Sequence, residues 1–132
     1  MNEHPNATTI KKGYEAFLNG DIDLIRQLMA DDIVWHGLGD NILRGVFRGK
    51  SEVVSFFGKL IMETQGTLNL EVHDVIANDE RAVILTTVTA ERNGKRVSAR
   101  TANVYELNSA GKVIAAYGPY SDESDKLDDF WQ

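Results

Sequence analysis

Residues 82–107 read AVILTTVTAERNGKRVSARTANVYEL, and their pattern indicates the fold class most clearly. Its opening run, Ala82 to Val88, is rich in β-branched side chains, which favour a strand. Asn93 and Gly94 both tolerate the positive φ that the central residues of a type I′ hairpin turn require. The chain then returns from Val97 to Leu107. We therefore predict a long antiparallel hairpin.

The same two-residue period continues on both sides of this hairpin. Before it, Leu68, Leu70 and Val72 alternate with polar neighbours, as in a strand with one buried face. After it, a turn at Ser109–Gly111 leads to a last strand from Val113 to Tyr117. The second half of the chain is therefore predicted to be an antiparallel meander.

The first half of the chain has the helical period instead. Ile10, Tyr14 and Phe17 lie four and three residues apart, which places them on one face of a helix. The predicted elements are a helix from the N-cap candidate Asn6 to Gly20, a short helix capped by Asp21, a strand over residues 33–36 and a helix from Ser51 to Gly66. Residues 37–49 are predicted to be irregular. Helices followed by a meander indicate an α+β domain with the helices packed on one sheet face.

Composition limits what the chain can be. Its 132 residues suit one domain, which we expect to span residues 1–132. With 14 basic against 20 acidic residues and a net charge of −6, the chain lacks the positive surface that binding to nucleic acid or to anionic membranes requires. The absence of cysteine excludes disulfides, thiolate nucleophiles and sulfur-ligated metal sites.

The motifs of common cofactor sites are missing, so we predict no cofactor and no metal. The sequence lacks GxGxxG and HExxH, and its histidines, His4, His36 and His73, show no spacing typical of metal ligands. The first residues contain Glu3 and Pro5 and no apolar run, so no secretory signal is expected. No stretch approaches the roughly 20 apolar residues of a membrane span. The expected location is the cytoplasm.

Three passages carry a resemblance to a known family: YEAFLNGD (14–21) with LMADDIVWH (28–36), LRGVFRGKSEVVSFF (43–57) and VYELNSAGKV (104–113). Together they resemble the nuclear transport factor two-like superfamily, and within it the SnoaL-like and ketosteroid-isomerase-like proteins. The resemblance implies a cone-shaped, curved antiparallel sheet wrapped around three helices of the N-terminal half. It also implies an apolar cavity inside the cone that suits a small apolar molecule, and a homodimer.

The resemblance also implies catalytic residues. In the steroid isomerases a tyrosine and a protonated carboxylic acid donate hydrogen bonds to the substrate oxygen, and a second carboxylate moves the proton. Motif matching places the tyrosine at Tyr14 and the second donor at Asn103, where an amide replaces the acid. The position of the base falls at Gly37, which cannot accept a proton. His36 is the first candidate to replace it, and Asp40 in the following loop is the second.

Further side chains are expected to line the cavity. They are mostly aromatic or lie on the strand of Asn103, and comprise Trp35, Phe47, Phe57, Thr101, Tyr105 and Tyr117. Each candidate also has a plainer interpretation: Tyr14 as a core residue, His36 as a structural histidine, and Asn103 as part of a polar sheet surface. The acidic tail is predicted to be solvated, with Phe130 and Trp131 folding back over the cavity or a partner subunit.

Three functions follow from these observations. In the first, the chain is an isomerase or cyclase that acts on a carbonyl compound by acid–base chemistry without a cofactor. Tyr14 and Asn103 would hold the oxygen, and His36 would move the proton. Alternatively, it is a non-catalytic module that binds a small apolar ligand. In the third interpretation it is a dimerisation module whose cavity has no ligand.

Overall fold

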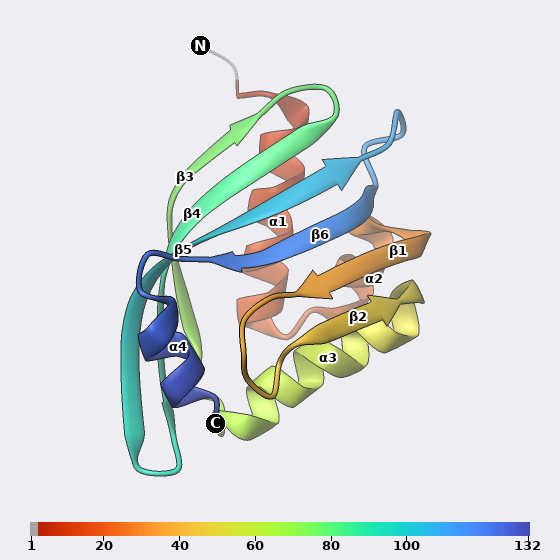
Figure 1. Ribbon diagram of the computed structural model, residues 1–132. Helices are drawn as coiled ribbons and strands as arrows, with labels where there is room; N and C mark the ends of the chain where they lie inside the picture. The colour runs from red at the N-terminus through yellow and green to blue at the C-terminus, as the bar shows by residue number, and fades with distance from the viewer. Residues whose placement is uncertain (1–2) are drawn as a thin grey trace.

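The computed structural model describes residues 3–132, which form a strongly curved sheet and four helices (Figure 1). In chain order the elements are α1 (Pro5–Asn19), α2 (Ile22–Leu28), β1 (Met29–Gly37), β2 (Gly45–Arg48), α3 (Gly49–Glu63), β3 (Asn69–Ala77), β4 (Arg81–Arg92), β5 (Lys95–Leu107), β6 (Val113–Tyr120) and α4 (Ser124–Phe130). The prediction of an α+β fold with a curved sheet is confirmed.

The six strands lie in the order β2-β1-β6-β5-β4-β3. The predicted hairpin is present as β4 and β5, and its turn residues have the positive φ expected of them, 52° at Asn93 and 78° at Gly94. One pairing differs from a simple meander, because β1 runs parallel to β6. Parallel neighbours need a long connection, and here β2, α3 and the strands β3 to β5 supply it.

The helices α1 and α3 lie on the inner face of the sheet, α1 against β3 and β4 and α3 against β1 and β2 (Figure 1). Gly20 ends α1 with φ 71°, and the Asp21 side chain accepts a hydrogen bond from the backbone N–H of Leu24 at 3.1 Å, both as predicted. The N-cap of α1 is His4 rather than Asn6. Pro5 takes the first helical position, where its missing N–H is not needed.

The prediction that residues 37–49 are irregular is wrong for the last five residues of this segment. Residues 45–48 form β2, an edge strand on which Phe47 pairs with Trp35 of β1, and α3 begins at Gly49. A strand of four residues shows too little alternation to be detected in the sequence. Its pairing with β1 is a tertiary contact.

Acidic side chains of the tail, such as Asp122, Asp125 and Asp129, are exposed to solvent as predicted, but the tail is not irregular. It forms α4, and it returns the aromatic pair at the C-terminus to the body of the protein, where Phe130 is 2% and Trp131 is 4% exposed. None of the helices within residues 3–132 is both long and apolar enough to cross a bilayer.

Candidate functional site

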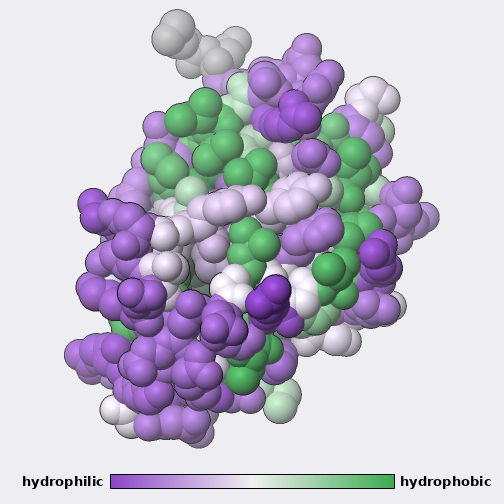
Figure 2. All heavy atoms as spheres, in the orientation of Figure 1, coloured by the Kyte–Doolittle hydropathy of each residue, from purple (hydrophilic) through white to green (hydrophobic). Residues whose placement is uncertain are grey.

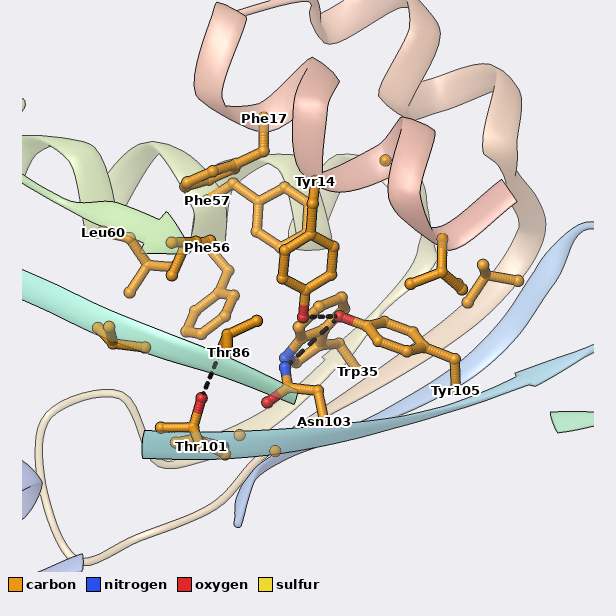
Figure 3. A pocket seen from close by; sticks show the side chains of 18 of the residues that line it. Tyr14, Phe17, Trp35, Phe56, Phe57, Leu60, Thr86, Thr101, Asn103 and Tyr105 are labelled. Atoms are coloured by element: carbon orange, nitrogen blue, oxygen red, sulfur yellow. Dashed lines mark hydrogen bonds between the residues drawn. The ribbon is translucent and has the colours of Figure 1, made fainter. Parts of the chain in front are cut away.

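A cavity of about 180 Å³ lies between the inner face of the sheet and the helices α1, α3 and α4. Its wall is mainly apolar. Its principal apolar side chains include Phe17 from α1, Trp35 from β1, and Phe56, Phe57 and Leu60 from α3 (Figure 3). Leu127 and Trp131 line it from the C-terminal part of the chain. Some of the aromatic rings pack edge to face, as Trp35 and Phe57 do with centroids 5.0 Å apart at 87°. Such an enclosure favours an apolar ligand.

The described part of this wall contains no Asp, Glu, His, Lys or Arg. The polar side chains that line it are Thr9, Tyr14, Thr86, Thr101, Asn103 and Tyr105. Among residues 3–132, no group of three or more carboxylate or imidazole side chains is placed to hold a metal ion. The chemistry available in the cavity is therefore that of neutral hydrogen-bonding groups.

The centre of the polar region is a pair of tyrosines. Tyr14 from α1 and Tyr105 from β5 meet at 2.7 Å between their hydroxyl oxygens, with the rings nearly perpendicular at 84° (Figure 3). The amide of Asn103 donates a longer hydrogen bond, 3.5 Å, to the Tyr105 hydroxyl. Alternation along β5 places Asn103 and Tyr105 on the same inner face. The pair joins residues that are 91 positions apart in the chain.

Burial keeps both phenols protonated at neutral pH. It raises the pKa of Tyr105 to about 12, although the hydrogen bonds from Tyr14 and Asn103 oppose the change. Burial also raises the pKa of Tyr14 well above its ordinary value, and the neighbouring Tyr105 adds to that rise. Two neutral hydroxyls have two hydrogens, of which their mutual hydrogen bond uses one. The other can be donated to a ligand.

Gly37 lines the cavity at the position where the resemblance requires a base. A Cβ atom there would lie 2.4 Å from the backbone carbonyl oxygen of Leu43. The loop after β1 therefore occupies the space of a side chain at this position. A carboxylate cannot be present at residue 37 unless this loop moves.

At Gly118 of β6, the Asn103 side chain occupies the space that a side chain of residue 118 would need. A Cβ atom on Gly118 would lie 2.3 Å from the Asn103 side-chain oxygen. The absence of a side chain at Gly118 gives the Asn103 amide its place beside Tyr105.

Six of the nine residues proposed from the sequence lie in the cavity wall: Tyr14, Trp35, Phe57, Thr101, Asn103 and Tyr105. His36 and Tyr117 do not. They stack on each other with ring centroids 4.5 Å apart at 4°. Because Trp35 and Gly37 face inward, the alternation of β1 turns His36 to the opposite, outer face of the sheet, and Tyr117 shares that face as its partner on β6. The expectation that His36 moves a proton in the cavity is therefore corrected.

Phe47 and Asp40 also lie outside the wall of the cavity. Phe47 stacks on Phe56 with centroids 4.4 Å apart and borders a shallow depression between β2 and α3. Asp40 is exposed, and its backbone N–H donates to Asp128 of α4 at 2.9 Å. Neither can contact a molecule bound among the tyrosines.

Thr86 and Leu127 are among the cavity residues that were absent from the sequence-based set. Thr86 could have been found, because the Asn93–Gly94 turn sets the register of β4 and β5 and that register places Thr86 opposite Thr101. Leu127 had no comparable signal, since α4 reaches the cavity only through tertiary packing.

The sequence model of the SnoaL-like domain matches residues 10–116. This chain therefore belongs to the SnoaL-like family. The structure of Bal32a, from a soil-derived mobile gene cassette, is 30% identical and superimposes with a TM-score of 0.91 over 97% of both chains. The fold is that of the nuclear transport factor two-like proteins. One such protein of unknown function, from Burkholderia pseudomallei, is 21% identical, with a TM-score of 0.85 over 98% of this chain and 99% of its own.

A more distant structure contains a ligand. It is a Mycobacterium tuberculosis protein in complex with estradiol-17β-hemisuccinate, 19% identical, with a TM-score of 0.77 over 92% of this chain and 98% of its own. At this identity the likeness extends to the fold alone.

Proposed function

We propose that this protein binds a small, mainly apolar molecule in its cavity and holds an oxygen atom of that molecule with Tyr14, Tyr105 and Asn103. The observation that carries the proposal is the hydrogen-bonded tyrosine pair in an uncharged, apolar wall. A neutral acceptor such as a carbonyl or ether oxygen matches these donors, whereas a charged ligand would be left without a counter-ion. The ligand complex of the mycobacterial relative supports the same use of this fold.

The size of the cavity limits the ligand. Its volume of about 180 Å³ is near that of an engineered apolar cavity of roughly 150 Å³ that binds benzene. Pockets for drug-sized molecules occupy about 300–1,000 Å³. A ligand of one ring with a few substituents fills this volume.

A second candidate function is an isomerase or cyclase acting on a carbonyl compound. It is favoured by the same donors, because neutral hydrogen-bond donors in an apolar site stabilise an oxyanion that forms during a reaction. Proton removal would depend on a group of the substrate itself, since the described wall offers neither carboxylate nor imidazole. The binding function needs no such group and is therefore preferred.

Thermal stability in the presence of ligands tests the binding function. A panel of monocyclic ketones and phenols is added to the wild type, to Tyr14→Phe and to Tyr105→Phe, with Tyr117→Phe as a control on the outer face. A ligand at about a hundred times its Kd adds roughly 2.7 kcal/mol, a rise of several degrees in Tm. The two cavity variants should lose much of this rise and Tyr117→Phe should keep it. Absence of any rise in the wild type would refute the proposal.

Analysis of the recovered ligand separates the two functions. A ligand that binds and is recovered unchanged after long incubation identifies a binding protein. A product whose rate of formation falls in Tyr14→Phe identifies an enzyme.

We also propose that a second copy of the chain covers the outer face of the sheet. Alternation turns Val46, Ile76 and Leu85 to this face, and all three are exposed. Figure 2 shows separate groups of hydrophobic side chains over the sheet, with weakly polar and hydrophilic ones between them, and mainly hydrophilic side chains over α4 and the neighbouring hairpin. Exposed apolar areas of this kind are typical of subunit interfaces.

A further inference from the structure

The threonine pair in the cavity wall has no function in the proposal above. Thr86 of β4 is 3% exposed and Thr101 of β5 is 6% exposed, and their hydroxyl oxygens lie 2.7 Å apart (Figure 3). Within residues 3–132 this is the one hydrogen bond that either hydroxyl makes. Thr64, which is also buried, differs because its hydroxyl donates to the backbone carbonyl of Leu60 at 2.8 Å.

Counting hydrogens shows what the pair leaves unused. Two hydroxyl groups have two hydrogens, and the bond between them uses one. The remaining hydrogen belongs to a buried group that borders the cavity, where an unmade hydrogen bond costs free energy. A pair of valines would have nearly the same shape without that cost. The threonines are therefore best explained by a ligand atom that accepts the second hydrogen.

The position of the threonine pair relative to the tyrosine cluster sets the distance between the two ligand atoms that could accept hydrogen bonds from them. Thr101 and Asn103 share the inner face of β5 and are two residues apart, which corresponds to about 6.6 Å along a strand. Asn103 belongs to the cluster formed with Tyr14 and Tyr105, so the cavity has donors at two separate places (Figure 3). A six-membered ring with an oxygen atom at each end fits this spacing when it lies along the strand and both hydrogen bonds run roughly perpendicular to it.

We infer that Thr86 and Thr101 form a second hydrogen-bonding subsite, and that the ligand is a monocyclic compound with two acceptor oxygens on opposite sides of its ring, such as a cyclic diketone or a quinone. This inference rests on the proposed function and names the ligand class of the same cavity. The tyrosine cluster holds one oxygen and the threonine pair holds the other. The aromatic wall encloses the ring between them.

Two probes of similar size separate the subsites: 1,4-cyclohexanedione, with two acceptors, and 4-methylcyclohexanone, with one. Their Kd values are measured by NMR titration of the wild type and of Thr86→Val/Thr101→Val. Both threonines are replaced because either one alone keeps a free hydroxyl. The double variant should bind the dione about three- to tenfold more weakly, the range for one neutral hydrogen bond, and bind the ketone unchanged. Thr89→Val, on the outer face of β4, should leave both Kd values unchanged.

The outcomes distinguish this inference from the proposed function. If both probes bind the wild type and the double variant keeps its affinity for the dione, the second subsite is refuted and the binding function stands. If neither probe binds a folded wild type, both are refuted. A measurement on the wild type alone guards against a variant that fails to fold: contacts between the bound dione and the Thr86 and Thr101 methyl groups in NOE spectra support the subsite, and contacts elsewhere in the cavity refute it.

Discussion

Gly37 and Gly118 determine the chemistry of the cavity through the atoms they make room for. At Gly37 the backbone carbonyl of Leu43 occupies the position of a side chain, and at Gly118 the Asn103 amide does. The Leu43 carbonyl leaves no room at residue 37 for the base that the resemblance requires. The space at Gly118 allows the Asn103 amide to lie beside Tyr105 as a donor. The site is therefore shaped as much by absent side chains as by those present.

Substitution of Gly37 tests this close approach. Gly37→Ala should lower the free energy of unfolding by about 1–3 kcal/mol, because the methyl group must displace backbone atoms of the loop. Urea denaturation measures the change. Gly58→Ala is the control, since a Cβ there meets nothing within 4 Å and alanine is favoured in a helix by roughly 0.5–1 kcal/mol. Equal stability of the two variants would contradict the described approach of Leu43.

The raised pKa of Tyr105 predicts a loss of stability in alkali. The folded-state value is about 12, and that of an unfolded tyrosine is about 10. The stability linked to the neutral phenol is complete below pH 10 and is lost as the pH rises from 10 to 12. By pH 11 the wild type should therefore lose about 1.4 kcal/mol more than Tyr105→Phe, relative to pH 8. Urea titrations at the two pH values measure this difference, and an equal loss in both proteins would contradict it.

A largely buried arginine is one of the residues that attach the helix α4 to the sheet. Arg92, at the end of β4, donates to the carbonyl oxygens of Phe130 at 3.2 Å and Gln132 at 2.7 Å. It also pairs with Glu63 of α3 at 3.0 Å and lies over the ring of Trp131. Because Trp131 forms part of the cavity wall, Arg92 stabilises this part of the wall.

Replacement of this arginine should loosen α4. Arg92→Lys keeps the charge but loses the planar group that reaches two carbonyls and Glu63 together. We expect a loss of about 1–3 kcal/mol in the free energy of unfolding and faster hydrogen exchange in α4. Arg96→Lys is the matched control, since that side chain is 80% exposed and pairs with Glu91 at the surface. Equal exchange rates of α4 in both variants would show that Arg92 does not hold the helix.

The outer face of the sheet carries exposed apolar side chains, among them Ile76, and the proposed dimer can be tested there. Ile76→Lys should shift a dimer to monomer in light scattering after size-exclusion chromatography, because a buried lysine without a partner is costly. Met62→Lys, on α3, replaces another exposed apolar residue away from this face and should leave the dimer intact. A wild type that is monomeric at all concentrations refutes the dimer.

Much of the fold could be predicted because its signals are local. The positive φ of Asn93 and Gly94, the Asp21 cap and the apolar stripe of α1 each depend on a few neighbouring residues. The resemblance to the family motifs pointed to Tyr14 and Asn103, and both lie in the cavity wall. Even the pairing of Thr86 with Thr101 follows from the register that one turn sets.

The sequence alone indicated the three helices of the N-terminal half, the hairpin and a net charge of −6 that does not suit binding to polyanions, and it pointed to Tyr14 and Asn103 as cavity residues. Only the tertiary structure decided that Tyr105 meets Tyr14 across 91 positions, that His36 lies on the outer face, and that the backbone at Leu43 replaces a base at Gly37. Short-range propensities and caps act within a turn or two of chain. Contacts between distant residues depend instead on strand register, sheet curvature and side-chain volume, which are established only when the whole chain packs together.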